Sequence, residues 1–371
     1  MRFLSANWIY PLNTNPINEG VICVSDTGEI IDILQDRKLV SSDSLEIYDG
    51  ILSPGFINSH CHLELSYLHK IINPKEGLLN FIKNIKSLRV NKPEEIIQAI
   101  SNAESDMIKN GIVAVGDICN TNYTIQQKSK KNLQYYNFVE IFETKEHSVL
   151  NKISEAKSLK SEFRDLNLTA TIVPHSPYSV TPSLMKSIAS EFDLEDKLLS
   201  IHMQESEMEN MLFSKKTGDL LEWLKSIEAC STIWKDRKRS LDILCELMDK
   251  PFLMVHNTYS EKLDIQDCYY CTCPKANQYI EDSLPDYSIF DKSKLCVGTD
   301  SLASNNSLSV FDELLVIKEN TDFTIETLLK IACKNGAEAL GFGSLGTFAK
   351  GKKPGINLID LGFTKFKKVI F

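Results

Sequence analysis

Eight short apolar runs, most of them separated by segments of helical periodicity, limit the fold of this chain more than any other feature of its sequence. The runs are Gly55–His60, Ile112–Val115, Phe138–Phe142, Thr169–Val173, Leu198–His202, Phe252–His256, Tyr269–Cys273 and Leu295–Gly298. The helical segments include Lys92–Asn110, Pro182–Glu191, Gly218–Ile227 and Leu241–Met248. This alternation predicts parallel strands joined by helices. Eight such units over roughly 290 residues favour a (β/α)8 barrel over an open, doubly wound sheet.

The turn after the first run also argues against the open sheet. An open dinucleotide-binding sheet has a G-x-G-x-x-G turn after its first strand. In this chain the first run ends in His60, Cys61 and His62, without that glycine pattern. The predicted fold class is therefore α/β, with a (β/α)8 TIM barrel as the main body.

Both ends of the chain have a different pattern. Short apolar runs at Val21–Val24, Glu29–Leu34 and Leu45–Tyr48 are separated by polar turns, which indicates a small antiparallel sheet. The C-terminal segment GTFAKGKKPGINLIDLGFTKFKKVIF returns to strand-like composition with Gly and Pro turns. We therefore expect a small β-sandwich domain built from both termini, residues 1–52 plus 345–371, beside a barrel over residues 53–344.

The charge balance limits the partners that this chain can bind. Lysine and arginine number 41 against 50 aspartate and glutamate residues, giving a formal net charge of −9. Such a charge opposes binding to phosphate backbones and anionic membranes. No apolar run approaches the ~18 residues of a membrane span, and the first residues lack a signal-peptide pattern. We expect a cytoplasmic protein that acts on a small molecule and has no nucleic-acid or membrane partner.

Side chains able to bind a metal stand where four of the apolar runs end. They are His60 and His62, His202 with Glu205, His256, and Asp300. The strands of such a barrel end at one face, where its active sites lie. Each residue alone has a simpler explanation, because a strand histidine is often a hydrogen-bonded core residue and an aspartate can cap a helix. Their coincidence at one face favours a shared functional site.

Three neutral imidazoles and a carboxylate suit one divalent ion, with Zn2+ favoured and Fe2+ or Mn2+ as alternatives. Such an ion lowers the pKa of a bound water toward ~7. Hydrolysis also needs a base for the water proton and an acid for the leaving group or a ring nitrogen. Asp300 and Glu205 are the candidates for these roles. His256 can orient the water or stabilise charge that develops on the attacked carbon.

Taken together, these residues resemble the amidohydrolase superfamily, and especially its metal-dependent aminohydrolases of purine-like or nucleoside-like substrates. The segment PGFINSHCH matches the opening H-x-H pattern, IHMQE matches H-x-x-E, and LMVHN and VGTDS supply the later histidine and aspartate. The resemblance covers essentially the whole chain. It implies a hydrolase of carbon–nitrogen bonds other than peptide bonds.

The resemblance also implies a role for each site residue. His60, His62, His202 and Asp300 would bind one metal ion. Glu205 would shuttle a proton to the ring nitrogen and contact substrate, and His256 would hold the nucleophilic water. Binuclear members often have a carboxylated lysine where this chain has His175 in PHSPYSVT, so a mononuclear site is predicted. In the deaminase branch the histidine equivalent to His175 contacts substrate.

The segment HCHLELS resembles the aminodeoxyfutalosine deaminases, which remove ammonia from an adenine ring during menaquinone synthesis. Glu64 would then contact a sugar hydroxyl, although a solvated carboxylate at a helix start explains it equally well. Deaminases of S-adenosylhomocysteine or methylthioadenosine are the next alternatives, followed by guanine deaminases and hydrolases of triazines or cyclic amides. A non-catalytic binding barrel is the alternative from another class. Related barrels are often dimers, so a homodimer is also expected.

Overall fold

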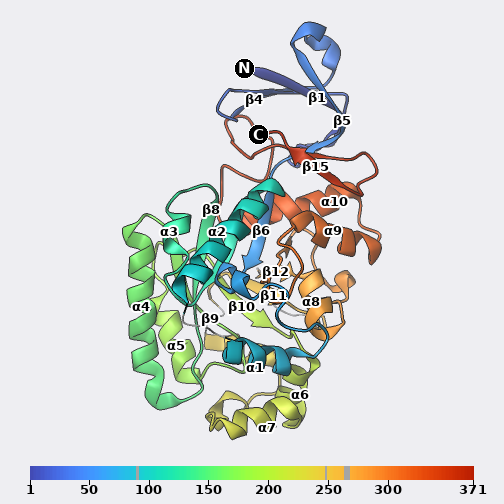
Figure 1. Ribbon diagram of the computed structural model, residues 1–371. Coiled ribbons are helices and arrows are strands. Elements are labelled where there is room, and N and C mark those ends of the chain that lie inside the picture. Colours follow the sequence, from blue (N-terminus) through green and yellow to red (C-terminus); the bar gives the residue numbers. More distant parts are fainter. Residues whose placement is uncertain (89–91, 247–248, 263–267) are drawn as a thin grey trace.

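Two four-stranded parallel sheets form the main body of the computed structural model, which describes residues 1–88, 92–246, 249–262 and 268–371 (Figure 1). The first sheet contains β6 (Phe56–Cys61), β7 (Ile112–Cys119), β8 (Gln134–Ile141) and β9 (Ala170–Pro174). The second contains β10 (Leu199–Met203), β11 (Phe252–His256), β12 (Cys268–Thr272) and β13 (Leu295–Val297). Every predicted barrel strand is thus present, with ends shifted by a few residues.

Backbone hydrogen bonds cross both seams between these sheets. The His202 N–H donates to the His175 carbonyl at 2.9 Å, joining β10 to the end of β9. The N–H groups of Thr299 and Asp300 donate to the His60 carbonyl at 3.0 and 3.1 Å, joining the end of β13 to β6. Nearby, the Asn58 amide donates to the Thr299 hydroxyl at 2.7 Å. The eight strands therefore close into a (β/α)8 barrel, as predicted.

Helices follow the strands and cover the outside of the barrel. They are α1 (Leu78–Leu88), α2 (Pro93–Lys109), α3 (Ile125–Lys128), α4 (Val149–Asp165), α5 (Pro182–Glu191), α6 (Glu207–Lys215), α7 (Asp219–Ser226), α8 (Pro274–Glu281), α9 (Val310–Glu319), α10 (Ile325–Leu329) and α11 (Gly336–Ala339). In α2 the buried residues Ile96, Ile100, Ala103 and Met107 recur at helical spacing, so one face packs on the barrel.

One predicted helix has a different form. The sequence pattern predicts an α-helix over Leu241–Met248, but the structure has a 3₁₀ helix over Ser240–Glu246. Leu247 and Met248 lie outside the described residues. Among the described residues, no helix combines the length and apolarity that crossing a membrane requires.

A seven-stranded sheet draws on both ends of the chain, as predicted. Its members are β1 (Arg2–Ile9), β2 (Ile17–Asn18), β3 (Val21–Val24), β4 (Ile30–Leu34), β5 (Leu45–Ser53), β14 (Asn357–Ile359) and β15 (Phe366–Val369). The predicted antiparallel sheet is instead mixed, because β1 pairs parallel with β5. The C-terminal β14 pairs antiparallel with β5, and β1 joins β5 to β3. Leu4, Ile22, Leu52 and Phe348 belong to a separate core beneath it. The domain limits at residues 52 and 344 stay a prediction.

The residue after β13 must be glycine, Gly298, because β13 and β6 approach each other closely at this point. A Cβ atom at this position would lie 2.7 Å from the His60 carbonyl oxygen and 2.8 Å from the His60 Cβ. We therefore expect Gly298→Ala to lower the free energy of unfolding by about 1–3 kcal/mol, measured by urea denaturation. Gly343→Ala is the matched control, because a Cβ there meets nothing within 4 Å. Equal stability of both variants would contradict this account of the seam.

Candidate active site

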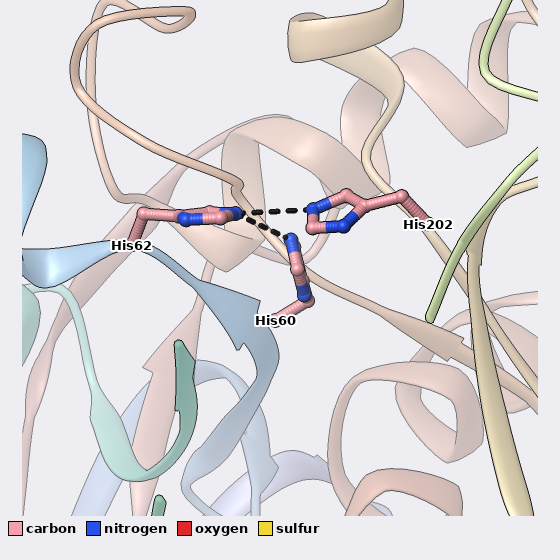
Figure 2. Close-up of side chains that lie close together, drawn as sticks. All are labelled: His60, His62 and His202. Atoms are coloured by element: carbon pink, nitrogen blue, oxygen red, sulfur yellow. Dashed lines mark hydrogen bonds between the residues drawn. The ribbon is translucent and has the colours of Figure 1, made fainter. Parts of the chain in front are cut away.

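Three histidine side chains from two opposed parts of the barrel meet at one point, as Figure 2 shows. His60 lies in β6, His62 follows β6, and His202 lies in β10. The Nε2 atom of His62 is 3.1 Å from Nε2 of His60 and 3.2 Å from Nε2 of His202. All three side chains are almost completely withdrawn from solvent.

Asp300 completes this group from the end of β13. Its Oδ1 lies 3.3 Å from Nε2 of His62 and 3.6 Å from Nε2 of His60. The Ser304 hydroxyl donates to the other carboxylate oxygen at 2.5 Å, which fixes the orientation of the group. The backbone of Asp300 is left-handed, with φ of 55°. Such a conformation costs a non-glycine residue roughly 1 kcal/mol or more, and it is common at functional sites.

The spacing of these atoms fits the coordination sphere of one metal ion. Ligand nitrogens about 2.0–2.1 Å from a tetrahedral ion lie ~3.3 Å apart. The His202 Nδ1–H donates to the His175 carbonyl at 2.9 Å, so Nε2 of His202 carries a free lone pair. Burial lowers the pKa of His62 to about 3, although Asp300 acts to raise it. Neutral imidazoles and an ionised carboxylate are the forms that bind metal.

Glu205 and His256 lie beside the four-residue group. Glu205 follows β10, and its Oε1 is 3.7 Å from Nε2 of His256. Burial raises the pKa of Glu205 well above its usual range, and the Asp300 carboxylate raises it further. Glu205 therefore holds a proton at pH values where an exposed glutamate is ionised. The His256 Nδ1–H donates to the Asn277 side-chain oxygen at 2.8 Å, so Nε2 of His256 is the acceptor facing the site.

Besides Glu205, the two other predicted substrate contacts, His175 and Glu64, stand in different surroundings. Nδ1 of His175 is 2.9 Å from the Ser176 hydroxyl, and its ring packs 4.7 Å from the ring of His202 between centroids. Glu64 is buried rather than solvated, and its carboxylate accepts the Thr121 N–H at 2.9 Å. The solvated alternative for Glu64 is therefore wrong. Whether Glu64 and His175 contact substrate stays a prediction.

The structure adds residues that the sequence patterns did not single out. Asn277 sets the tautomer of His256, Ser304 orients Asp300, and Glu140 Oε1 lies 3.4 Å from Nδ1 of His202. Asn277 lies in the segment CPKANQYI and Ser304 lies four residues beyond Asp300. In the sequence, these residues differ from others only in being polar and close to a predicted strand end. Such residues are common, so this feature does not identify them.

A cavity of about 680 Å3 opens next to Glu205. Its lining includes Ser206, which follows Glu205, together with Trp223 and Tyr259. Among the described lining residues, five are carboxylates and one is a lysine: Glu76, Glu207, Asp219, Glu222, Glu281 and Lys83. The cavity lies between α1, α6 and α7, at the end of the barrel away from the seven-stranded sheet (Figure 1). Glu205, His256 and the four residues of the metal-competent group are not part of its lining.

Comparison with known proteins agrees with this arrangement. The model of the amidohydrolase family matches residues 51–371. The chain belongs to that family. The match spans every barrel strand and each of the site residues described above.

Curated relatives of this amidohydrolase extend over most of the chain. It is 26% identical over 378 residues to an aminodeoxyfutalosine deaminase of a Nitratiruptor species, with 93% of this chain and 88% of that protein covered. It is 24% identical over 378 residues to a 5'-deoxyadenosine deaminase of Methanosphaera stadtmanae, covering 92% of this chain and 81% of that protein. Both relatives are named for small-molecule deamination.

Solved structures show the same fold. A crystal structure of Helicobacter pylori aminofutalosine deaminase in complex with methylthio-coformycin has a TM-score of 0.81 at 23% identity, covering 100% of this chain and 98% of that one. An atrazine chlorohydrolase of Arthrobacter aurescens complexed with zinc has a TM-score of 0.75 at 16% identity, covering 97% and 87%. These likenesses support the predicted barrel with its small β-sandwich.

Removal of one ligand tests the metal site directly. We expect His62→Ala to reduce the bound divalent metal to a small fraction of the wild-type content, because His62 contacts the other three side chains of the group. Metal content after dialysis is measured by mass spectrometry. His147→Ala is the control, because His147 is exposed. Full metal content in the His62 variant would contradict the assignment.

Proposed function

We propose that this amidohydrolase is a mononuclear metal-dependent deaminase of adenine nucleoside-like substrates, of the aminodeoxyfutalosine type. The observation that carries the proposal is the convergence of three Nε2 atoms and one carboxylate, beside a buried glutamate whose raised pKa favours the acid form. The names of the relatives support the reaction class. A role in menaquinone synthesis follows if aminodeoxyfutalosine is the substrate.

His60, His62, His202 and Asp300 are the residues that would hold the ion, with Zn2+ favoured over Fe2+ or Mn2+. When bound, the ion would activate a water molecule for attack on the ring carbon that carries the amino group. The buried, neutral histidines leave the carboxylate of Asp300 as the negative ligand. Asp300 would also serve as the base, and its hydrogen bond from Ser304 keeps the other oxygen directed at His60 and His62.

Glu205 and His256 supply the remaining proton chemistry. The protonated carboxyl of Glu205 would donate its proton to a ring nitrogen of the substrate, which makes the ring carbon more electrophilic. Nε2 of His256 would accept a hydrogen bond from the attacking water, because Asn277 holds the proton on Nδ1. Departure of ammonia then requires one more proton, which Asp300 would deliver after taking it from the water. The proton left on the new hydroxyl would return to Glu205 as the ring carbonyl forms.

The charge of the residues that line the neighbouring cavity limits the charge of the substrates that would bind there. Five carboxylates and one lysine line it, so a phosphorylated substrate would be repelled. A neutral or cationic extension on the nucleoside suits this lining better. Methylthioadenosine, S-adenosylhomocysteine and 5'-deoxyadenosine therefore belong in the same test panel as aminodeoxyfutalosine. Guanine and triazines are the remaining alternatives within the family.

Ammonia release from this panel tests the proposal. We expect the zinc-loaded protein to release ammonia from at least one adenine nucleoside. We also expect adenosine 5'-monophosphate to have a kcat/KM at least ~10-fold below that of adenosine, with a smaller difference at high salt. Absence of release from every member by protein with one bound ion per chain would count against the proposal.

The role of Glu205 predicts a specific variant and pH profile. Glu205→Gln should lower kcat by at least ~100-fold while metal content stays at one ion per chain. Because burial raises the pKa of Glu205, the acid form required for catalysis is lost only when pH rises through that raised value. The wild-type kcat should therefore fall on the alkaline side, and the residual activity of the variant should lack this limb. If the pH profile of the variant kept the alkaline limb, the proton donated to the ring nitrogen would come from a group other than Glu205.

A further inference from the structure

A buried ion pair lies behind the H-x-H segment and has no part in the chemistry described above. Nζ of Lys128, at the end of α3, is 2.5 Å from Oδ2 of Asp117 in β7, and both side chains are 0% exposed. The same Nζ lies 3.1 Å from Sγ of Cys119 and within 5.2 Å of the ring centres of Tyr135 and Phe163. Burying two charges is costly, so such a pair needs an explanation.

The second oxygen of Asp117 connects this pair to the metal ligands. Oδ1 of Asp117 accepts the N–H of Leu63 at 2.8 Å, and Leu63 directly follows His62. The next residue, Glu64, accepts backbone N–H groups of Asn120 and Thr121 at 3.3 and 2.9 Å. Three hydrogen bonds therefore attach the segment after His62 to the end of β7.

We propose that Lys128 and Asp117 are positioning residues that set the placement of His62 in the metal site. Lys128 fixes one carboxylate oxygen of Asp117, so the other oxygen has one direction in which to accept from Leu63. This contact holds the backbone that carries the ligand. The inference rests on the proposed metal site, but it concerns only residues outside the coordination sphere.

The charge of Lys128 is maintained in this environment. Burial acts to lower the pKa of its ammonium, but Asp117 raises it, and the net pKa lies above its usual range. Burial also raises the pKa of the Cys119 thiol, despite the nearby ammonium. Lys128 is therefore a cation that faces a neutral thiol and one carboxylate. Removing its charge leaves the carboxylate of Asp117 buried without a counter-ion.

A second buried lysine provides the matched control. Nζ of Lys160 is 2.8 Å from Oδ2 of Asp196, and the side chains are 8% and 0% exposed. Asp196 precedes β10, so this pair lies at the opposite ends of the strands from the metal site. Asp196 also pairs with Arg164 at 2.9 Å, so Lys160→Met should lower stability less than Lys128→Met does. It should leave the metal site unchanged.

The test compares zinc affinity with stability in the full-length protein. Apparent Kd values for Zn2+ are measured by competition with a chromophoric chelator, and Tm of the metal-free protein by circular dichroism. We expect Lys128→Met to weaken zinc binding by about 10–100-fold, as loss of an outer-sphere partner does in other metal sites. Lys160→Met should bind zinc within about 3-fold of wild type, since it leaves the first coordination sphere and its supports intact.

A double variant keeps the test informative if Lys128→Met does not fold. Asp117→Asn/Lys128→Met removes both charges and retains an oxygen able to accept from Leu63, so zinc affinity should return to within about 3-fold of wild type. The positioning role would be overturned if Lys128→Met bound zinc as tightly as wild type. It would also be overturned if the double variant lost as much zinc affinity as a folded Lys128→Met. Failure of the wild type to bind zinc would instead overturn the proposed function.

Discussion

The carbonyl group of His60 is the constraint on which this molecule depends. It accepts the N–H groups of both Thr299 and Asp300, and so joins the first and last strands of the barrel. The same residue contributes one imidazole to the candidate metal site, and Asp300 contributes the carboxylate. Closure of the barrel and assembly of the site are therefore one event. A chain that failed to close here would leave Asp300 apart from His60 and His62.

Specific partners hold several of the polar side chains at the candidate site. Nδ1 of His202 donates to a backbone carbonyl, Nδ1 of His256 donates to Asn277, and Ser304 donates to Asp300. These bonds decide which nitrogen carries a proton and which carries a lone pair. The lone pairs and the carboxylate of the candidate site therefore already converge, as the proposed binding of a cation requires. Burial alone would produce neutral histidines but would not orient them.

Much of this arrangement follows from local sequence patterns, and the remainder depends on distant contacts. The strand β11 and the helix α5 begin and end where the sequence predicts, because each is a short periodic segment bounded by turn residues. The strand β7 continues to Cys119, four residues beyond its predicted end, since Asp117 is buried against Lys128. The residues at the strand ends could be recognised as a group from their chemistry. Asn277 and Ser304 could not, because only the folded chain brings them to the ligands.

Left-handed backbone at Gln204, His256 and Asp300 places strain at the ends of β10, β11 and β13. The lining of the neighbouring cavity comes instead mainly from α1, α6 and α7, which are relaxed helices outside the barrel. The parts that perform chemistry and the parts that line the cavity therefore belong to different layers of the molecule. The two layers meet at Gln204, whose backbone N–H and side-chain amide donate to Glu209 and Asn210 of α6. Under the proposed function, substitutions in α1 and α7 would therefore alter the ligand preference of this chain more readily than its reaction.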